Sequence, residues 1–300
     1  MRPALPPHEQ TSAPRADGVT TPDTPRVARS RTIAALLAVG VLAGPVAADG
    51  EWSDQGRCAV PESFIAQHVT LARTALKLKF DEPIKIVAIG SSSTEGVGAS
   101  SPENSYPARL AEELERLWPE AEITVVNRGV GSERAHQMLA RFDRDVFAEK
   151  PDLVIWQAGT NSALQVDSMA ETTRDILVQG IERLQTAGID VVLMSPQYAP
   201  SFNRQQRNLL HVEAVRSAAR QTGVAVFRRF EIMQYWLASG QMTLDEMLSP
   251  DGLHLNDLSY GCIANQMAAL VDRATHSKSV LVAAQSSLPA SVFAGEGTGQ

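Results

Sequence analysis

The sequence lacks an excess of basic residues. Its 300 residues include 27 Lys and Arg against 34 Asp and Glu, which gives a formal net charge of −7 at pH 7. A protein that binds the phosphate backbone of nucleic acids needs a basic surface to attract it. The charge balance therefore argues against nucleic acid as a partner.

Cysteine is also scarce, because the chain contains only Cys58 and Cys262. Neither belongs to a CxxC pair or lies near clustered histidines, so the sequence offers no ligand set for a structural zinc ion. We expect neither a metal nor a cofactor. In an oxidising compartment the two cysteines would be able to form a disulfide. The alternative is that they are two unrelated thiols and that Cys262 is simply packed in the core.

The sequence contains no apolar run of the roughly 20 residues that a membrane-spanning helix needs. The most apolar run, residues 33–46, follows a segment that ends in Arg26, Arg29 and Arg31, and it precedes Ala47 and Ala48. Basic, apolar and then small residues in this order are typical of a secretory signal peptide. We expect residues 1–48 to be such a peptide with a long basic N-terminal region, and an uncleaved anchor is the alternative.

Cleavage after Ala48 predicts a secreted or periplasmic protein that has no stable membrane span. Residues 49–80 are then expected to form an N-terminal helical extension, with a helix over 62–78. Residues 81–276 form the predicted globular domain, and residues 277–300, rich in Ala, Ser and Gly, are expected to be a flexible tail. No feature of the sequence indicates the oligomeric state.

Short apolar, β-branched segments alternate with longer segments of helical spacing in the predicted domain. The expected strands are 84–89, 122–126, 152–157, 190–194 and 224–227, and the expected helices are 106–117, 133–147, 169–185, 204–221 and 258–273. This alternation predicts an α/β fold with right-handed crossovers. We therefore expect a flavodoxin-like three-layer α/β/α architecture with a five-stranded parallel sheet, whose ligands bind at the carboxyl ends of the strands.

Three segments that follow the first three strands carry residues suited to catalysis. GSSSTEG (90–96) exposes hydroxyl groups, but it lacks the Lys of a phosphate-binding P-loop, the GxGxxG of a dinucleotide site and the GxSxG of an α/β-hydrolase elbow. NRGVGSE (127–133) and GTN (159–161) offer backbone N–H groups and one carboxamide, which suit an oxyanion. Each segment, taken alone, is also typical of an ordinary turn.

A fourth segment, SPDGLHLND (249–257), places Asp251 three residues before His254. At this spacing the carboxylate is able to accept the imidazole Nδ1–H, which leaves Nε2 free to act as a base. A surface Asp and His in a turn is the alternative. All four segments are expected to meet at one edge of the sheet, and this convergence favours a catalytic site.

Taken in order, the four segments resemble the sequence blocks of the SGNH (GDSL-like) hydrolases over residues 84–270. Ser92 matches the nucleophile position, residues 127–132 the second block, Asn161 the third, and Asp251 with His254 the last. The resemblance implies a catalytic triad of Ser92, His254 and Asp251. It also implies an oxyanion hole formed by the backbone N–H groups of Ser92 and Ser132 and by Asn161 Nδ2.

Two positions depart from the pattern of this family. Ser91 stands where the family has Asp, and Ser132 stands where it has the glycine of the oxyanion hole. The run of three serines also makes Ser91 and Ser93 alternatives to Ser92 as the nucleophile. Register with the preceding Gly90 favours Ser92.

The sequence thus predicts a secreted serine ester hydrolase that acts on small-molecule or glycan esters with a short acyl chain. Tyr198 and Phe202, which follow the fourth strand, are expected to line the substrate cleft. The alternatives are a lysophospholipase- or thioesterase-type lipid esterase, an acyltransferase with the same triad, and a binding module whose site is degenerate.

Overall fold

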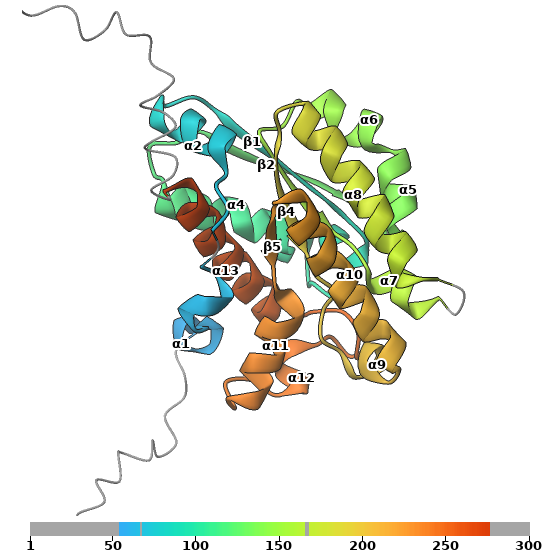
Figure 1. Ribbon diagram of the computed structural model, residues 1–300. Helices are drawn as coiled ribbons and strands as arrows, with labels where there is room; N and C mark the ends of the chain where they lie inside the picture. Colours follow the sequence, from blue (N-terminus) through green and yellow to red (C-terminus); the bar gives the residue numbers. More distant parts are fainter. Residues whose placement is uncertain (1–53, 67, 166–167, 277–300) are drawn as a thin grey trace, which may run out of the picture. The chain divides into compact units, whose positions relative to one another are not determined.

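The structure, a computed structural model, describes residues 54–276 except 67, 166 and 167. The predicted signal peptide and tail lie outside the described residues. The strands are β1 (Ile84–Gly90), β2 (Ile123–Gly129), β3 (Leu153–Gln157), β4 (Asp190–Met194) and β5 (Ala225–Phe227). All neighbours pair in parallel, in the order β2-β1-β3-β4-β5, which confirms the predicted five-stranded sheet (Figure 1).

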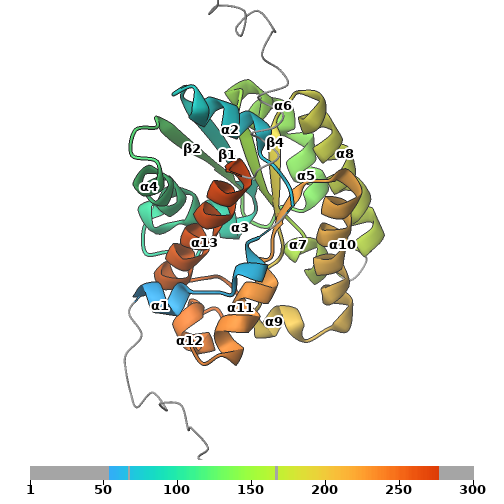
Figure 2. The same cartoon turned by 60° about the vertical axis from the view of Figure 1, so that its left-hand side comes forward.

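Helices cover both faces of the sheet (Figure 2). The longer ones are α2 (Ala72–Lys79), α4 (Tyr106–Leu117), α8 (Ala170–Thr186), α10 (Gln206–Thr222), α11 (Arg229–Ala238) and α13 (Asp257–Thr275). The shorter ones are α1 (Asp54–Cys58), α3 (Ser92–Glu95), α5 (Ala135–Ala140), α6 (Phe142–Asp145), α7 (Thr160–Leu164), α9 (Pro200–Asn203) and α12 (Leu244–Met247). Of the described helices, none is both long and apolar enough to cross a membrane.

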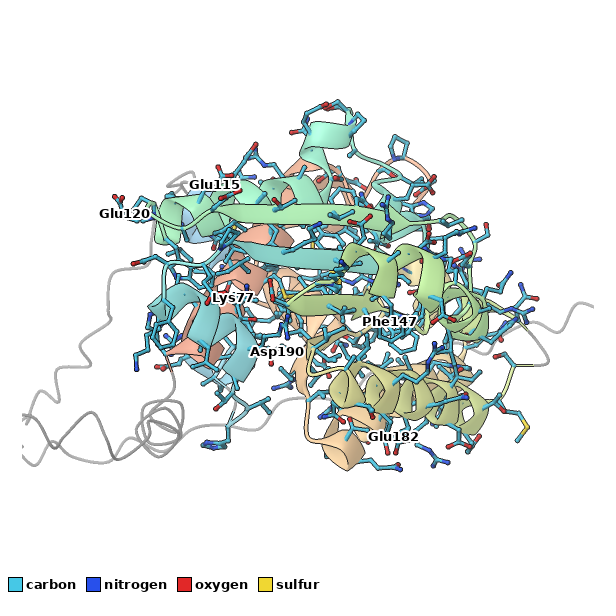
Figure 3. The ribbon with its side chains drawn as sticks, turned by 90° about the horizontal axis from the view of Figure 1, so that it is seen from above. Lys77, Glu115, Glu120, Phe147, Glu182 and Asp190 are labelled. Atoms are coloured by element: carbon cyan, nitrogen blue, oxygen red, sulfur yellow. A yellow bond between two sulfur atoms is a disulfide. The ribbon has the colours of Figure 1, made fainter. Side chains whose placement is uncertain are left out.

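Successive residues of the strands pack alternately in two apolar cores, one on each face of the sheet. Ile86 and Ala88 of β1 pack in a core with residues of α4, α11 and α13. Val87 and Ile89 pack in a second core with residues of α5, α8 and α10. Figure 3 shows β1 and β2 side by side, with Glu120 near the end at which β2 begins. Burial on both faces explains why the strands read as nearly continuous apolar runs.

Two predicted helices are wrong in their extent. The helix expected over 62–78 is a 3₁₀ turn (Glu62–Phe64) followed by α2. The helix expected over 133–147 begins two residues later as α5 and breaks at Arg141, where α6 begins, with a further 3₁₀ turn at Phe147–Glu149. At the break, Arg141 leaves helical geometry with φ −105° and ψ 10°, and its side chain donates to backbone carbonyl groups outside its own helix, as described below.

Besides several helices of one turn, the sequence analysis missed the longer helix α11. α11 buries Phe230, Ile232, Met233 and Trp236 on one face, but that face also carries the charged Arg229, and the opposite face carries the aromatic Tyr235 and Ala238. Helical spacing is recognised by contrast between an apolar and a polar face. Because α11 offers almost no such contrast, its sequence did not indicate a helix.

A disulfide joins Cys58 of α1 to Cys262 of α13. Cys262 is fully buried and Cys58 nearly so. Figure 2 shows α1 lying against the beginning of α13. The structure thereby decides between the two alternatives left open by the sequence, and the bond ties the first described helix to the last.

We expect Cys58→Ala to lower the free energy of unfolding by about 2–5 kcal/mol, because a bond between residues 204 positions apart restricts the unfolded chain. Urea titration with and without a thiol reductant measures this effect. The reductant should lower the midpoint of the native protein and leave that of the variant unchanged. A native midpoint that does not respond to reduction would contradict the prediction.

Candidate active site

The register of the sheet brings the ends of its strands to one edge. Gly90, the last residue of β1, pairs with Gly129, the last of β2. Ile89 pairs with Trp156, one residue before the end of β3. The segments that leave these strands therefore start side by side, at the edge where parallel sheets bind ligands.

Ser92 lies on a tight turn immediately after β1, as the first residue of α3. This turn crosses the end of β2 so closely that a Cβ added to Gly129 would lie 2.0 Å from the backbone nitrogen of Glu95. Asn127 Nδ2 donates a hydrogen bond to the carbonyl of Thr94 at 2.8 Å, and Asn127 Oδ1 accepts one from the Gly129 N–H. Asn127 and Gly129 therefore hold the turn that carries Ser92.

Ser92, His254 and Asp251 form a continuous hydrogen-bonded series. Ser92 Oγ lies 2.8 Å from His254 Nε2, although 162 positions separate the two residues in the sequence. On the other side of the ring, His254 Nδ1 lies 2.5 Å from Asp251 Oδ2. A hydroxyl, an imidazole and a carboxylate in this order are able to transfer the hydroxyl proton to the ring during nucleophilic attack.

The Asp251 carboxyl is surrounded by hydrogen-bond donors. Partial burial raises its pKa, but hydrogen bonds from the His254 ring, from the backbone N–H groups of His254 and Leu253 and from the Ser249 hydroxyl outweigh burial. The pKa of Asp251 is thus held below its usual range. The side chain is therefore a carboxylate at neutral pH and fixes the Nδ1–H tautomer of the ring.

The loop that carries His254 is folded back on itself. The Ser249 N–H donates to the His254 carbonyl at 2.8 Å, and Leu248 pairs with Leu255 in an antiparallel bridge. A Cβ added to Gly98 would lie 2.3 Å from the Leu255 carbonyl oxygen, so the segment after α3 touches this loop. These contacts fix the position from which the imidazole reaches Ser92.

Asn161 and Ser132, the two donors expected from neighbouring segments, lie on loops that touch. Asn161 Nδ2 donates one of its two N–H groups to the backbone carbonyl of Glu133 at 2.9 Å, directly beside Ser132. Ser132 adopts a positive φ of 63°, a conformation that favours glycine. The backbone at this position thus has the geometry of the glycine that the SGNH pattern places there, although the residue is Ser.

Arg141, which the sequence analysis did not select, anchors the loop that carries Ser132. Its nearly buried guanidinium donates to the Glu133 carboxylate at 2.7 Å and to the carbonyls of Arg128 and Gly90 at 2.8 and 3.2 Å. It also pairs with Asp145 at 2.8 Å. Arg141 therefore connects the ends of β1 and β2 to the following loop. A buried Arg carries no periodic signal by which the sequence would reveal it.

Ser91, one of the two departures from the family pattern, has a structural partner. Its backbone N–H and its hydroxyl both donate to Gln157 Oε1, at 2.9 and 3.0 Å. Thr94 Oγ1 lies 3.3 Å from the same oxygen. Gln157 is a fully buried polar residue at the end of an otherwise apolar strand, and that contrast in the sequence is the signal that would have indicated it.

The two aromatic residues expected to line the cleft differ in burial. Phe202 is fully buried and packs at 6.1 Å between ring centroids against Phe230, so its assignment to an open cleft is wrong. Tyr198 is half-buried and packs against the same ring at 5.4 Å. Its contact with substrate stays a prediction. The physical reason for the error is the unforeseen helix α11, which supplies Phe230.

A cavity of about 570 Å³ adjoins the His254 loop. Its walls include Gly98, Leu244, Leu248, Pro250 and Gly252, but neither Ser92 nor His254. Within the described ranges, no three His, Cys, Asp or Glu side chains are gathered closely enough to hold a metal ion.

Residues 57–277 match the model of a protein family described as the non-GDSL lipase-like family. The chain belongs to this family. The match includes every segment of the site, from the turn at Ser92 to the loop with His254. Together with the relatives described next, it confirms the resemblance to the SGNH (GDSL-like) hydrolases.

The similar proteins of known activity are carboxylic ester hydrolases. An acetylxylan esterase from Geobacillus stearothermophilus is 32% identical over 93 residues, which are 28% of this chain and 42% of that protein. An arylesterase from Vibrio mimicus is 24% identical over 170 residues, which are 57% and 79% of the two chains. The matched segment thus spans less than half of the acetylxylan esterase.

Solved structures show the same fold. A two-domain esterase active on acetylated mannans superposes with a TM-score of 0.58 at 21% identity, over 71% of this chain and 55% of that one. The chain therefore corresponds to about half the length of that protein. This likeness supports the three-layer α/β/α architecture.

We expect Ser132→Gly to raise the free energy of unfolding by about 0.5–1 kcal/mol. Glycine adopts the positive φ without strain, and this gain exceeds the loss that comes from the greater entropy of the unfolded chain. Lys150→Gly, at a φ of 52° in a turn outside the site, is the matched control and should gain a similar amount. Urea unfolding measures both. A loss of stability in Ser132→Gly alone would show that the serine side chain stabilises the loop.

The low pKa of Asp251 leads to a simple pH dependence. Its carboxyl is ionised throughout about pH 5 to 8 and therefore accepts the Nδ1–H of the His254 ring over this whole range. We expect the activity on an ester to show no loss caused by protonation of this carboxyl in that range. NMR titration of the Asp251 carboxyl carbon measures it, and a protonation midpoint within pH 5 to 8 would contradict the prediction.

Proposed function

We propose that the protein is a serine ester hydrolase in which Ser92 is the nucleophile, His254 the general base and Asp251 the residue that orients it. The observation that carries the proposal is the 2.8 Å contact between Ser92 Oγ and His254 Nε2, with Asp251 bound to the opposite ring nitrogen. Membership of a family whose relatives are esterases supports it.

In the proposed reaction, Ser92 Oγ attacks the ester carbonyl carbon while His254 Nε2 accepts the hydroxyl proton. The developing oxyanion accepts hydrogen bonds from the backbone N–H groups of Ser92 and Ser132 and from the second N–H of Asn161 Nδ2. His254 returns the proton to the leaving alcohol, and an acyl-enzyme remains. Water, deprotonated by His254, then releases the acid and restores Ser92.

The proposed substrates are esters of short acyl groups on carbohydrates or other small molecules. The sequence relative that acts on acetylxylan and the structural neighbour active on acetylated mannans support this choice. The acidity of the chain, with 34 Asp and Glu against 27 Lys and Arg, disfavours anionic acyl donors such as acyl-CoA.

We propose that the protein acts outside the cytoplasm, after removal of residues 1–48. The basic, apolar and small segments of that region support export. The Cys58–Cys262 disulfide supports it independently, because such bonds persist in oxidising compartments and are rare in the cytosol.

Ser92→Ala should lower kcat for a small chromogenic ester about 1,000-fold or more, because it removes the nucleophile. Ser93→Ala is the matched control, since Ser93 lies on the same turn with its hydroxyl fully buried, whereas His254 Nε2 contacts Ser92 Oγ. Steady-state kinetics and circular dichroism on both variants provide the test. Loss of activity in Ser93→Ala with retention in Ser92→Ala would show that the nucleophile is assigned to the wrong serine.

The acyl preference is tested with p-nitrophenyl esters of two, eight and sixteen carbons and with acetylated xylo-oligosaccharides. We expect the two-carbon ester and the acetylated glycans to give the highest kcat/KM. A preference for the sixteen-carbon ester would instead identify a lipid esterase. Transfer of the acetyl group to an added sugar, detected by mass spectrometry, would identify an acyltransferase.

A further inference from the structure

Arg229, the first residue of α11, is a fully buried cation that forms no ion pair with any of the described residues. Its Nε donates to the Ser195 carbonyl at 3.1 Å, and its Nη2 donates to Gln197 Oε1 at 2.9 Å. In the part of the chain that the structure describes, no carboxylate lies within ion-pair distance of the guanidinium, and Nη1 has no hydrogen-bond partner. Burial lowers the pKa of Arg229 to about 10, so the group remains charged at neutral pH.

Gln197, the partner of Arg229, bridges two of the segments that form the candidate active site. Its Oε1 also accepts a hydrogen bond from Thr160 Oγ1 at 2.9 Å, and its Nε2 donates to the Leu253 carbonyl at 3.4 Å. Thr160 directly precedes Asn161, and Leu253 directly precedes His254. One almost completely buried side chain thus connects the hydroxyl of the residue next to Asn161 with the backbone carbonyl of the residue next to His254.

Arg229 determines which way the Gln197 amide points. A guanidinium has only donors, so it requires the oxygen of the amide, and the nitrogen is then directed at the Leu253 carbonyl. With an apolar residue at position 229, the amide would be able to rotate and lose its bonds to Thr160 and Leu253.

The cluster around Arg229 also reaches the turn that carries Ser92. Tyr106 and Tyr260 are buried and lie near enough to the guanidinium to affect the pKa of Arg229. Tyr106 lies 3.4 Å from Thr94 Oγ1, and the Tyr260 hydroxyl donates to the Val97 carbonyl at 2.6 Å. Thr94 and Val97 follow Ser92 within five residues, so three of the four segments of the site have contacts with this cluster.

Burying a guanidinium that has no ion-pair partner lowers stability, because the charge must be desolvated. An apolar side chain of similar size would pack at the same place without this loss. Such a group is retained where it supplies something that packing does not, and here it supplies a donor that fixes an amide. We propose that Arg229 and Gln197 are positioning residues that hold Asn161 and His254 in place relative to Ser92. This inference rests on the proposed function.

Gln197→Glu separates positioning from stability. The new carboxylate neutralises the buried guanidinium, so the melting temperature should stay the same or rise. It has no N–H for the Leu253 carbonyl and repels that oxygen, so the His254 loop should shift. We expect kcat to fall about 10- to 100-fold with KM changed less than about twofold, because a displacement of roughly 1 Å affects the transition state most.

The matched control is Gln241→Glu. Gln241 is also a buried glutamine, but its Nε2 donates to the Gly56 and Ala59 carbonyls around α1 rather than to the site. This variant should lose stability and keep the kcat of the native protein. In both cases kcat is expressed per active site titrated with a fluorophosphonate, so that unfolded molecules do not contribute.

Substitutions at position 229 test the coupling. Arg229→Met should reduce kcat about as much as Gln197→Met, and the double variant should lose no more than either single one, because both act through the same amide. Arg229→Lys keeps a donor for Gln197 Oε1 and should recover part of the loss. Hydrogen exchange of residues 158–164 and 249–256, which does not depend on activity, should accelerate in Gln197→Met and not in Gln241→Met.

Unchanged kcat per site in Gln197→Glu, or additive losses in the double variant, would overturn the proposal. Failure of the proposed function would be visible already in the native protein, as absence of both ester turnover and fluorophosphonate labelling. The two failures are therefore distinguishable.

Discussion

The parallel pairing of β1 with β2 through Gly90 and Gly129 is the constraint on which the arrangement of the site depends. It brings the turn with Ser92 over the end of β2, where a residue larger than glycine at position 129 would meet the backbone of that turn. The same alignment starts the Ser132 loop beside the turn. Residues from separate parts of the sequence therefore reach one point because the strands that carry them end together.

The register of the strands determines where the loops of the site begin, but not the positions of their side chains. Hydrogen bonds from buried polar side chains hold the loops in place. Gln157 binds the turn at Ser91, and Arg141 binds the ends of β1 and β2 to Glu133. Gln197 occupies the corresponding place between the segments of Asn161 and His254. These buried side chains connect the ends of the strands and the segments that follow them with one another, so the loops of the site are held by hydrogen bonds as well as by the sheet.

Much of this arrangement was predictable because it depends on local pattern. Buried strands such as β1 are apolar runs that end in turn residues, and α4 shows a helical stripe through Tyr106, Leu110 and Leu114, so its bounds were predicted correctly. The contact of Ser92 with His254 was expected, since both follow from ordered motifs at one edge of a parallel sheet.

The rest depends on tertiary contacts that leave no periodic trace. α11 was missed because a charged residue, Arg229, lies on its buried face and Tyr235 on its outer face, and the burial of Phe202 against Phe230 was missed with it. Arg141 and Arg229 each donate to a backbone carbonyl that lies on another element of the fold. Such partners are specified by the assembled fold and not by the spacing of neighbouring residues.

The most direct test of the central claim is a crystal structure of the protein after reaction with a phosphonate ester inhibitor. The account predicts a covalent bond from phosphorus to Ser92 Oγ. It also predicts that the phosphonyl oxygen lies roughly 2.7–3.1 Å from the backbone nitrogens of Ser92 and Ser132 and from Asn161 Nδ2. A phosphonyl group on another residue, or one whose oxygen points away from these three donors, would contradict it.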